Sequence, residues 1–259
     1  MLKSTKVMEM NNDREKIILE TLKEKQSVEV KQLCKLLYAS ESTVRRTLTS
    51  LEKKGLIIRA HGKALDAGAY ADKNIAFFLR ENVAVGVKAK IAEQAVKECV
   101  CGGAVLMLDA SSTVMKTVDL IKTYKDVIVI TSGIKTLFTL TQTDIKYVST
   151  GGQAINSSYS FIGQTAIDTI RNFNADVCFL SCRGISSSGM VTDTSVTEND
   201  VRKAMMQQSK RNVLLIDSTK IDNGCWHNLC DISEFDDVFC NAPLPDEILQ
   251  KVKNFHLVK

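Results

Sequence analysis

The stretch SESTVRRTLTSLEKKGLIIRAHGKA, Ser40–Ala64, decides the fold of the first part of this chain. Ser40 is a good N-cap, and Gly55 is a good residue to end a helix that runs from there through Lys54. Between them, apolar residues recur at helical spacing at Val44, Leu48 and Leu51. The following segment, LIIRAHGKAL, alternates and contains a glycine, as a small β-hairpin does. The stretch therefore predicts a helix followed by a hairpin.

Two further helices are predicted before this stretch. The segment DREKIILETLKEKQ is expected to begin at Asp13, which can cap it, and VEVKQLCKLLY is expected to form the second helix before the tight turn YAS. The side chains expected to face inward are Ile17, Ile18, Thr21 and Leu22 on the first helix and Val30, Leu33, Leu36 and Leu37 on the second. Helix, helix, tight turn, helix and hairpin is the order of a winged helix-turn-helix.

The outward face of the third helix is polar and basic. It carries hydrogen-bond donors for base edges and cations for phosphates, which is a pattern that favours DNA binding. The stripe consists of Ser42, Arg46, Thr49 and Lys53, with Arg45 on its flank, and the hairpin adds Arg59, His61 and Lys63. Two other roles stay open. Glu41 lies four residues before Arg45, as in an ion-paired surface helix, and a three-helix module can also dock on protein.

The charge distribution supports a separate basic head. The chain has 259 residues, which allows one or two domains, and its formal net charge is +4. Residues 1–64 contain 14 Lys and Arg against 8 Asp and Glu, so they carry +6 and the remainder carries −2. A basic end on a mildly acidic body is typical of a nucleic-acid-binding head.

Membrane, disulfide and metal chemistry are not predicted. The longest apolar runs are far short of the ~20 residues that a membrane span needs, and the N-terminal residues lack the apolar core of a signal peptide. A cytoplasmic protein is therefore expected. Among eight cysteines no C-x-x-C occurs, and the group Cys225, His227 and Cys230 lacks a fourth ligand at zinc-site spacing. Reduced cysteines are expected, with no bound metal and no cofactor.

The rest of the chain predicts a mostly parallel α/β domain. After a polar connector, the segment VKAKIAEQAVKECV reads as a helix. Six short apolar runs follow, each a candidate strand: AVLMLD, DVIVIT, KYVST, DVCFLS, NVLLID and DDVFC. Such runs alternating with helices imply a parallel sheet covered on both faces. The predicted division is 1–64 for the DNA-binding domain, 65–86 for the linker and 87–259 for the effector and oligomerisation domain.

Small polar residues follow several of these strands. Ligands of parallel sheets bind at the carboxyl ends of the strands, and hydroxyl residues that open a helix can cradle an anion. The residues at these ends are Asp109, Ser111, Ser112, Thr113, Thr131, Ser132, Gly151, Gly152, Asp217, Ser218, Thr219 and Lys220. Lys220 can supply a point charge to a phosphate. We expect a pocket for a small, hydroxyl-rich anion, and no G-x-G-x-x-G follows any strand to indicate a dinucleotide.

The Ser40–Ala64 stretch resembles the helix-turn-helix signature of the DeoR family of bacterial transcription regulators. The matching residues are Ser40, Thr43, Arg45, Arg46, Leu48, Leu51, Glu52, Gly55, Leu56, Arg59, His61, Gly62 and Ala64. Through this match Ser40 and Thr43 join the candidate DNA contacts. Thr47 replaces the usual aspartate and Lys63 replaces a glycine, and both changes are expected to make the surface more positive. Thr47 is then the position expected to distinguish this protein's DNA contacts from those of its relatives.

The second part of the chain is similar to the DeoR effector domain, whose fold resembles ribose-phosphate isomerase and which typically senses a sugar phosphate. Residues that match its motifs are Lys88, Ile91, Ala92, Asp109, Ala110, Thr113, Thr131, Gly151, Gly152, Phe161, Ile162, Gly163, Asp217, Ser218 and Lys220. Arg183 stands where the family has an acidic residue. Because a guanidinium cannot act as a base, catalysis is not expected. Arg183 either contacts an anionic group of the effector or pairs with Asp193 or Glu198, and Glu198 is also expected near the pocket.

The sequence therefore predicts a transcription regulator, a repressor of a carbohydrate operon, that binds double-stranded operator DNA and a phosphorylated sugar. The alternative is a sugar-phosphate isomerase with an appended helix-turn-helix domain. Because two heads must meet two half-sites, a homo-oligomer is expected, and dimer and tetramer stay open.

Overall fold

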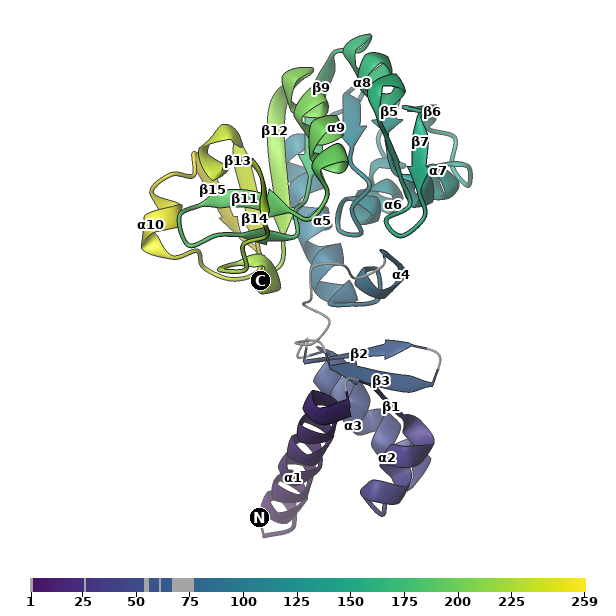
Figure 1. Ribbon diagram of the computed structural model, residues 1–259, viewed down its shortest axis with the longest axis vertical. Coiled ribbons are helices and arrows are strands. Elements are labelled where there is room, and N and C mark those ends of the chain that lie inside the picture. Colours follow the sequence, from purple (N-terminus) through teal and green to yellow (C-terminus); the bar gives the residue numbers. More distant parts are fainter. Residues whose placement is uncertain (1, 26, 54–55, 61, 67–76) are drawn as a thin grey trace. The chain divides into compact units, whose positions relative to one another are not determined.

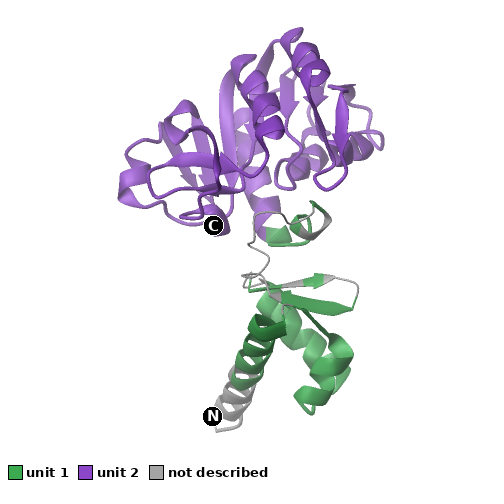
Figure 2. Ribbon diagram, viewed as in Figure 1, with its two compact units in different colours: residues 1–86 green, residues 87–259 purple. Residues whose placement is uncertain are grey.

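The computed structural model describes residues 2–25, 27–53, 56–60, 62–66 and 77–259. It divides the chain into two compact units, Met1–Gly86 and Val87–Lys259 (Figure 2). Residues 67–76 of the predicted linker lie outside the described residues. The short helix α4, Phe77–Arg80, follows them.

The first unit is a winged helix-turn-helix, as predicted (Figure 1). Its strands form an antiparallel sheet in the order β1-β3-β2, in which β2 and β3 make the wing. Its elements are α1 (Leu2–Lys25), β1 (Ser27–Glu29), α2 (Val30–Leu36), α3 (Glu41–Lys53), β2 (Ile57–Ala60) and β3 (Lys63–Asp66).

Two element boundaries differ from the sequence prediction. Asp13 lies inside α1 and does not cap it, because the helix begins at Leu2. The second helix begins at Val30, because Ser27–Glu29 forms a strand that pairs with β3 through Val28 and Ala64. Three residues are too few to show an alternating pattern, so this pairing was not predictable from periodicity.

The core of the head contains most of the predicted apolar residues. Its fully buried members include Ile18, Leu22, Leu33, Val44, Leu48 and Leu51. Two predicted core residues are wrong: Ile17 is 40% exposed and Leu36 is 47% exposed. A helix turns about 100° per residue, so neighbours such as Ile17 and Ile18 do not both reach the centre of one apolar stripe.

The second unit is built on a seven-stranded sheet in the order β15-β14-β12-β9-β4-β5-β6, in which all neighbouring pairs are parallel. The six predicted runs all form strands of this sheet. Its strands are β4 (Val105–Leu108), β5 (Ile128–Thr131), β6 (Lys146–Ser149), β9 (Ala175–Leu180), β12 (Ser209–Ile216), β14 (Asp237–Cys240) and β15 (Asn254–Leu257).

Helices cover both faces of this sheet (Figure 1). Successive residues of a strand point to opposite faces, so Met107 packs into one core with α8 and α9, whereas Leu106 and Leu108 pack into the other with α5 and α6. The helices are α5 (Val85–Cys99), α6 (Val118–Ile121), α7 (Ile134–Leu140), α8 (Gln164–Arg171), α9 (Val196–Gln207) and α10 (Asp246–Leu249), with short 3-10 turns at Val114–Thr117, Ser218–Lys220 and Ile232–Glu234.

Two small antiparallel sheets were not predicted. One is the hairpin of β7 (Gln153–Ile155) and β8 (Ser160–Ile162), and the other is β10-β11-β13, formed by Gly184–Ile185, Met190–Asp193 and His227–Asp231. Both follow carboxyl ends of the large sheet and supply side chains to the region described below.

The strand order reverses direction between β4 and β9, which lie side by side. The chain proceeds from β4 through β5 to β6 on one side and from β9 through β12 to β14 on the other. The chain therefore leaves the carboxyl ends of β4 and β9 in opposite directions along the sheet, and at such a point a parallel sheet leaves a crevice for ligands.

None of the helices described is long and apolar enough to cross a membrane.

Candidate DNA-binding face and effector site

The N-terminus of α3 is capped by hydroxyl groups, as predicted. The Thr43 backbone N–H donates to Ser40 Oγ at 3.4 Å. Ser40 Oγ also lies 3.0 Å from Ser42 Oγ and 2.9 Å from Thr43 Oγ1. These three exposed hydroxyls form one small cluster at the end of the helix that a helix-turn-helix presents to base edges.

The two adjacent arginines of α3 differ in their partners. Arg45 donates twice to Glu41 Oε1, at 2.6 and 2.8 Å, so the ion pair expected of a surface helix is present. Arg46 is exposed and has no hydrogen bond or ion pair within the described part of the chain. Arg46 is therefore the arginine of this pair whose guanidinium is available to another molecule.

The wing is attached to α3 through Arg59. Its Nη1 donates to Thr49 Oγ1 at 2.9 Å and lies 3.6 Å from Glu52 Oε2. Lys63, on the other strand of the wing, lies 4.0 Å from Glu29 and is half exposed. His61 and the side chain of Lys53 fall outside the described residues.

Thr47 does not lie on the outer surface, so the expectation that it makes that surface more positive is wrong. It is 6% exposed, and its Oγ1 donates to the Thr43 carbonyl at 3.1 Å. Thr47 lies three residues after Val44 and four before Leu51, so it falls on the same inward face of α3 as these buried residues. Its departure from the family pattern therefore alters packing inside the head.

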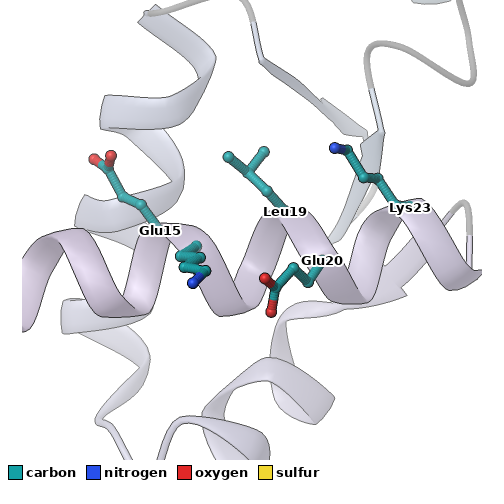
Figure 3. A pocket seen from close by; sticks show the side chains of 5 residues that line it. Glu15, Leu19, Glu20 and Lys23 are labelled. Atoms are coloured by element: carbon teal, nitrogen blue, oxygen red, sulfur yellow. The ribbon is translucent and has the colours of Figure 1, made fainter.

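A shallow depression lies on α1 and contains none of the predicted site residues (Figure 3). It is lined by Glu15, Lys16, Leu19, Glu20 and Lys23. Glu15 accepts a hydrogen bond from Ser50 Oγ at 2.9 Å, which ties α1 to α3. Acidic and basic side chains alternate along this surface, which is typical of a solvated helix face.

In the second unit, Asp109 joins the two loops of the switch point. Its Oδ1 accepts from the Ser111 backbone N–H at 2.9 Å, and its Oδ2 accepts from the Ser181 backbone N–H at 3.3 Å. The same Oδ2 accepts from Arg202 Nε at 3.1 Å. Asp109 is buried, so its carboxylate holds the loops after β4 and β9 together.

Arg202, on α9, is the centre of a buried charge cluster. Besides Asp109, its Nη1 donates to Asp193 Oδ2 and to Asn199 Oδ1, each at 2.9 Å. Burial opposes the charged form, but Asp193 and Asp109 raise the pKa of Arg202 well above its usual range. The guanidinium is therefore charged at every physiological pH.

Arg202 was missed by the sequence analysis, although a signal was present. It lies among Val201, Met205 and Met206 on the apolar face of α9, where an unpaired arginine would be costly. An arginine on a buried helix face predicts buried carboxylates opposite it, and Asp109 and Asp193 fill that role.

Arg183 lies beside Asp193, which is one of the two alternatives left open by the sequence. Its Nε is 3.9 Å from Asp193 Oδ1, and its side chain is largely buried. Burial lowers the pKa of Arg183, while Asp193 and Glu198 act in the opposite direction. Burial raises the pKa of Asp193, but Arg202 and Arg183 outweigh it and hold that pKa below its usual value.

Two lysines lie near the ends of β4 and β12. Lys88, on α5, is buried and donates to Ser112 Oγ at 3.1 Å. Burial raises the pKa of Asp217, but Lys220 and Lys88 outweigh it and lower that pKa below the usual value. The two predicted cations therefore act on the same carboxylate.

Acid is expected to destabilise the second unit through Asp217. Because the folded pKa lies below that of the unfolded chain, near 3.9, the stabilisation is fully present above that value and is lost as the pH falls through the folded pKa. We expect the melting temperature to fall as the pH drops below about 4, and to fall less steeply in Asp217→Asn. Calorimetric scans at several pH values measure the melting temperature of both proteins. Equal dependence of the melting temperature on pH in the two proteins would contradict the prediction.

A small cavity at the switch point brings several of these groups together. Its lining consists of Asp109, Ala110, Ser132, Ser160, Phe161, Glu198, Val201 and Arg202. Asp109, Ser132 and Glu198 were predicted, whereas Ser160, Phe161 and Arg202 were not. Its volume is about 10 Å³, far below the ~300–1,000 Å³ of common ligand pockets, so an occupant of sugar-phosphate size requires the loops to open.

Other predicted site residues hold the backbone. Thr131 is buried, donates to the Leu108 carbonyl at 2.7 Å and accepts from the Gly133 N–H at 3.0 Å. Ser111 Oγ accepts from the Val114 N–H at 3.2 Å, and Thr113 is buried beside it. None of these three lines the cavity.

Gly152 is expected to be required for packing. Its φ is +104°, and a Cβ built there would lie 2.5 Å from the Ile162 carbonyl oxygen. We expect Gly152→Ala to lower the free energy of unfolding by about 1–3 kcal/mol. Urea titration measures the change. Gly102→Ala is the matched control, because its nearest neighbour would be 3.5 Å away, and equal effects of the two changes would contradict the prediction.

Metal ligation has no support among the residues that the structure describes. No three His, Cys, Asp or Glu side chains gather there in a group that could hold a metal ion. His227 Nδ1 instead lies 2.9 Å from Asn199 Nδ2, and Cys230 is buried as a free thiol.

The chain thus joins a winged helix-turn-helix to a parallel α/β unit with a charged crevice, and because one fold can host many functions, its role is decided by its relatives. Two family descriptions match the chain. "DeoR-like helix-turn-helix domain" matches residues 14–66, and "DeoR C terminal sensor domain" matches residues 84–242. The chain belongs to the DeoR family of transcription regulators.

Individual relatives match along almost the whole chain. The L-fucose operon activator of Haemophilus influenzae (strain ATCC 51907 / DSM 11121 / KW20 / Rd) is 28% identical over 245 residues, covering 95% of this chain and 97% of the relative. The glycerol-3-phosphate regulon repressor of Escherichia coli (strain K12) is 26% identical over 241 residues, covering 93% of this chain and 94% of the relative.

The similarity to solved structures is low. Ribose 5-phosphate isomerase from Plasmodium falciparum aligns with a TM-score of 0.40 and 18% identity over 52% of each chain, which is too low to carry an argument. Family membership, in contrast, confirms the predicted DeoR-type regulator and makes the chain a transcription regulator, not an enzyme. The isomerase alternative is not supported.

Proposed function

We propose that this protein is a cytoplasmic repressor of a carbohydrate-metabolism operon and that a phosphorylated sugar modulates its hold on operator DNA. The observation that carries the proposal is the charged crevice at the switch point between β4 and β9. It lies where parallel sheets bind ligands, and it is flanked by Lys88, Lys220 and Arg183. The names of relatives, which include operon regulators for fucose and glycerol-3-phosphate, support a carbohydrate effector.

For DNA, we propose that α3 enters the major groove and that the wing contacts the backbone beside it. The proposed contacts are Ser40, Ser42, Thr43, Arg45, Arg46, Thr49, Lys53, Arg59, His61 and Lys63. Arg46 is the strongest of them because its guanidinium has no partner within the described residues. Arg45 can also contribute by exchanging its pair with Glu41 for a phosphate.

For the effector, we propose that the phosphate group meets Lys220 and that hydroxyls at the strand ends bind the sugar. The proposed set is Lys88, Asp109, Ser111, Ser112, Thr113, Thr131, Ser132, Gly151, Gly152, Arg183, Glu198 and Lys220. Lys220 is partly exposed, so its ammonium can reach a ligand, and Lys88 acts on the same carboxylate, Asp217.

The coupling between the two events is a linkage of binding equilibria. A ligand that binds one arrangement of the sensor units better than another shifts the population toward it, and DNA binding changes by the same free energy. Two heads are needed for two half-sites about one helical turn apart, so a dimer or a larger homo-oligomer is part of the proposal.

Thermal shift with a set of sugar phosphates tests the effector site. At one hundred times the dissociation constant, a ligand stabilises the folded form by about 2.7 kcal/mol, which raises the melting temperature by several degrees. We expect the shift in the natural protein and in Lys97→Ala, an exposed control on α5, and its loss in Lys220→Ala. A shift that persists in Lys220→Ala would contradict the proposed phosphate contact.

Operator selection tests the regulatory role. The purified full chain is mixed with random-sequence duplex DNA, and the retained fragments are sequenced. We expect a two-fold repeated motif that the active sugar phosphate releases. Failure of every sugar phosphate to change DNA affinity would contradict the proposed modulation while leaving DNA binding intact.

A further inference from the structure

Tyr38, in the turn between α2 and α3, occupies a backbone position that favours glycine. The α2 helix ends at Leu36, and Tyr38 follows with a φ of +48°. The Tyr38 N–H donates to the Lys35 carbonyl at 3.4 Å, and the Ala39 N–H donates to the Cys34 carbonyl at 3.1 Å. This pair of bonds is the Schellman motif, whose left-handed residue is usually Gly and sometimes Asn.

A tyrosine in this conformation is unfavourable, because its Cβ crowds the neighbouring carbonyl oxygen. Contacts of the side chain within the protein do not compensate for this. Tyr38 is 98% exposed, and its ring and hydroxyl have no contact with the residues that the structure describes. Strained residues without a structural reason are found at functional sites, where the side chain serves a partner.

Tyr159 shows what a left-handed tyrosine looks like when the fold explains it. Its φ is +50°, close to that of Tyr38. Its ring, however, is half-buried, and Lys135 Nζ lies 5.2 Å from the ring centroid. The Tyr159 carbonyl also accepts from the Ile134 N–H at 2.7 Å, at the start of α7. Tyr38 makes no comparable contact among the described residues that would account for its left-handed backbone.

The place of Tyr38 identifies the partner. It lies two residues before Ser40, the N-cap of α3, whose hydroxyl clusters with those of Ser42 and Thr43. In a helix-turn-helix this end of the third helix faces the groove, with the phosphate backbone on either side. A phenol can donate to a phosphate oxygen while its ring covers the adjoining sugar.

We propose that Tyr38 is a DNA-contacting residue whose hydroxyl donates to a backbone phosphate beside the groove that α3 enters. The inference rests on the proposed DNA-binding face and adds to it a contact outside the polar stripe of α3. Because a phenol is neutral, this contact adds affinity without releasing a counterion, unlike the contacts of Lys63 and Arg46.

The test uses the full chain and a duplex recovered by selection with the natural protein, with affinity measured at several salt concentrations. We expect Tyr38→Phe to weaken binding about tenfold to a hundredfold, as for a lost hydrogen bond to a charged group. The slope of log affinity against log salt stays unchanged. Lys63→Ala, in contrast, is expected to reduce that slope by about one unit per head.

Tyr38→Gly separates the DNA role from a structural one, because stability and affinity change in opposite directions. Glycine relieves the left-handed strain, so the head is expected to melt several degrees higher while DNA affinity falls at least as far as in Tyr38→Phe. Tyr159→Gly is the matched control, and it should lose stability without a direct effect on the DNA contact.

The outcomes are distinguishable. If both Tyr38 variants bind the duplex as tightly as the natural protein while Arg46→Ala does not, the Tyr38 contact is refuted and the DNA face stands. If Arg46→Ala also binds normally, the DNA face itself is refuted. Should Tyr38→Gly fold poorly, Tyr38→Phe decides, because it keeps the ring and removes only the hydroxyl.

Discussion

Replacing Arg202 with methionine is expected to lower the free energy of unfolding of the second unit by about 3–5 kcal/mol. Methionine fills a similar volume but removes the guanidinium that pairs with the buried Asp109 and Asp193, and leaves Asp193 with only the more distant Arg183. Both carboxylates are almost completely buried, so water cannot replace the guanidinium without opening the crevice. Urea unfolding followed by the fluorescence of Trp226, the single tryptophan, measures the change in this unit.

Two comparisons show whether uncompensated charge is the cause. Arg171→Met removes an exposed pair with Asp168 at 3.4 Å and is expected to cost less than about 1 kcal/mol. Adding Asp109→Asn and Asp193→Asn to Arg202→Met should recover part of the loss, because neither asparagine carries a charge. If Arg202→Met costs no more than Arg171→Met, the cluster is not a major source of stability.

Arg46→Ala is expected to abolish specific operator binding while the fold stays intact. A well-placed arginine contact discriminates by about 1–3 kcal/mol, so a protein that binds through two heads loses at least about thirty-fold in affinity. The Arg46 side chain has no partner in the described part of the head, so its removal leaves no group unpaired. Fluorescence anisotropy with a selected duplex measures the affinity, and circular dichroism measures the helical content.

Lys23→Ala provides the control for lost charge alone. Lys23 is an exposed cation of the same head on α1, outside the proposed DNA face. We expect its replacement to weaken binding only slightly, and affinity should fall steeply with salt in both variants. Equal affinities for Arg46→Ala and the natural protein, with the fold retained, would mean that the polar stripe of α3 is merely solvated.

The large elements were predictable because each shows its period within a single segment. Val44, Leu48 and Leu51 lie one helical turn apart, and all three are fully buried. The central strands are continuous apolar runs because both of their faces are covered, as Leu106, Met107 and Leu108 demonstrate. Such patterns are independent of the rest of the chain.

The features that were missed depend on partners far away in the sequence. Ser27–Glu29 is a strand only because Ala64 and its neighbours offer an edge. Arg202 is buried only because Asp109, 93 residues away, meets it. Thr47 was assigned to the surface from a family pattern, although its place on the helix beside Leu48 already turned it inward. Helical spacing alone could have predicted that Thr47 is buried, but it could not have predicted the strand at Ser27–Glu29 or the ion pairs of Arg202.

The hydrogen bond from Arg59 to Thr49 has a consequence for the spacing of the base pairs that the head can contact. Because this bond joins the wing strand to α3, the two elements would meet DNA as a single rigid unit if both make the contacts proposed above. Inserting one base pair between their footprints turns one of them by roughly 34° about the DNA axis, since a turn takes about 10.5 base pairs. A rigid unit cannot follow that rotation, so under the proposed binding mode affinity would depend on the spacing of the contacted base pairs as well as on their sequence.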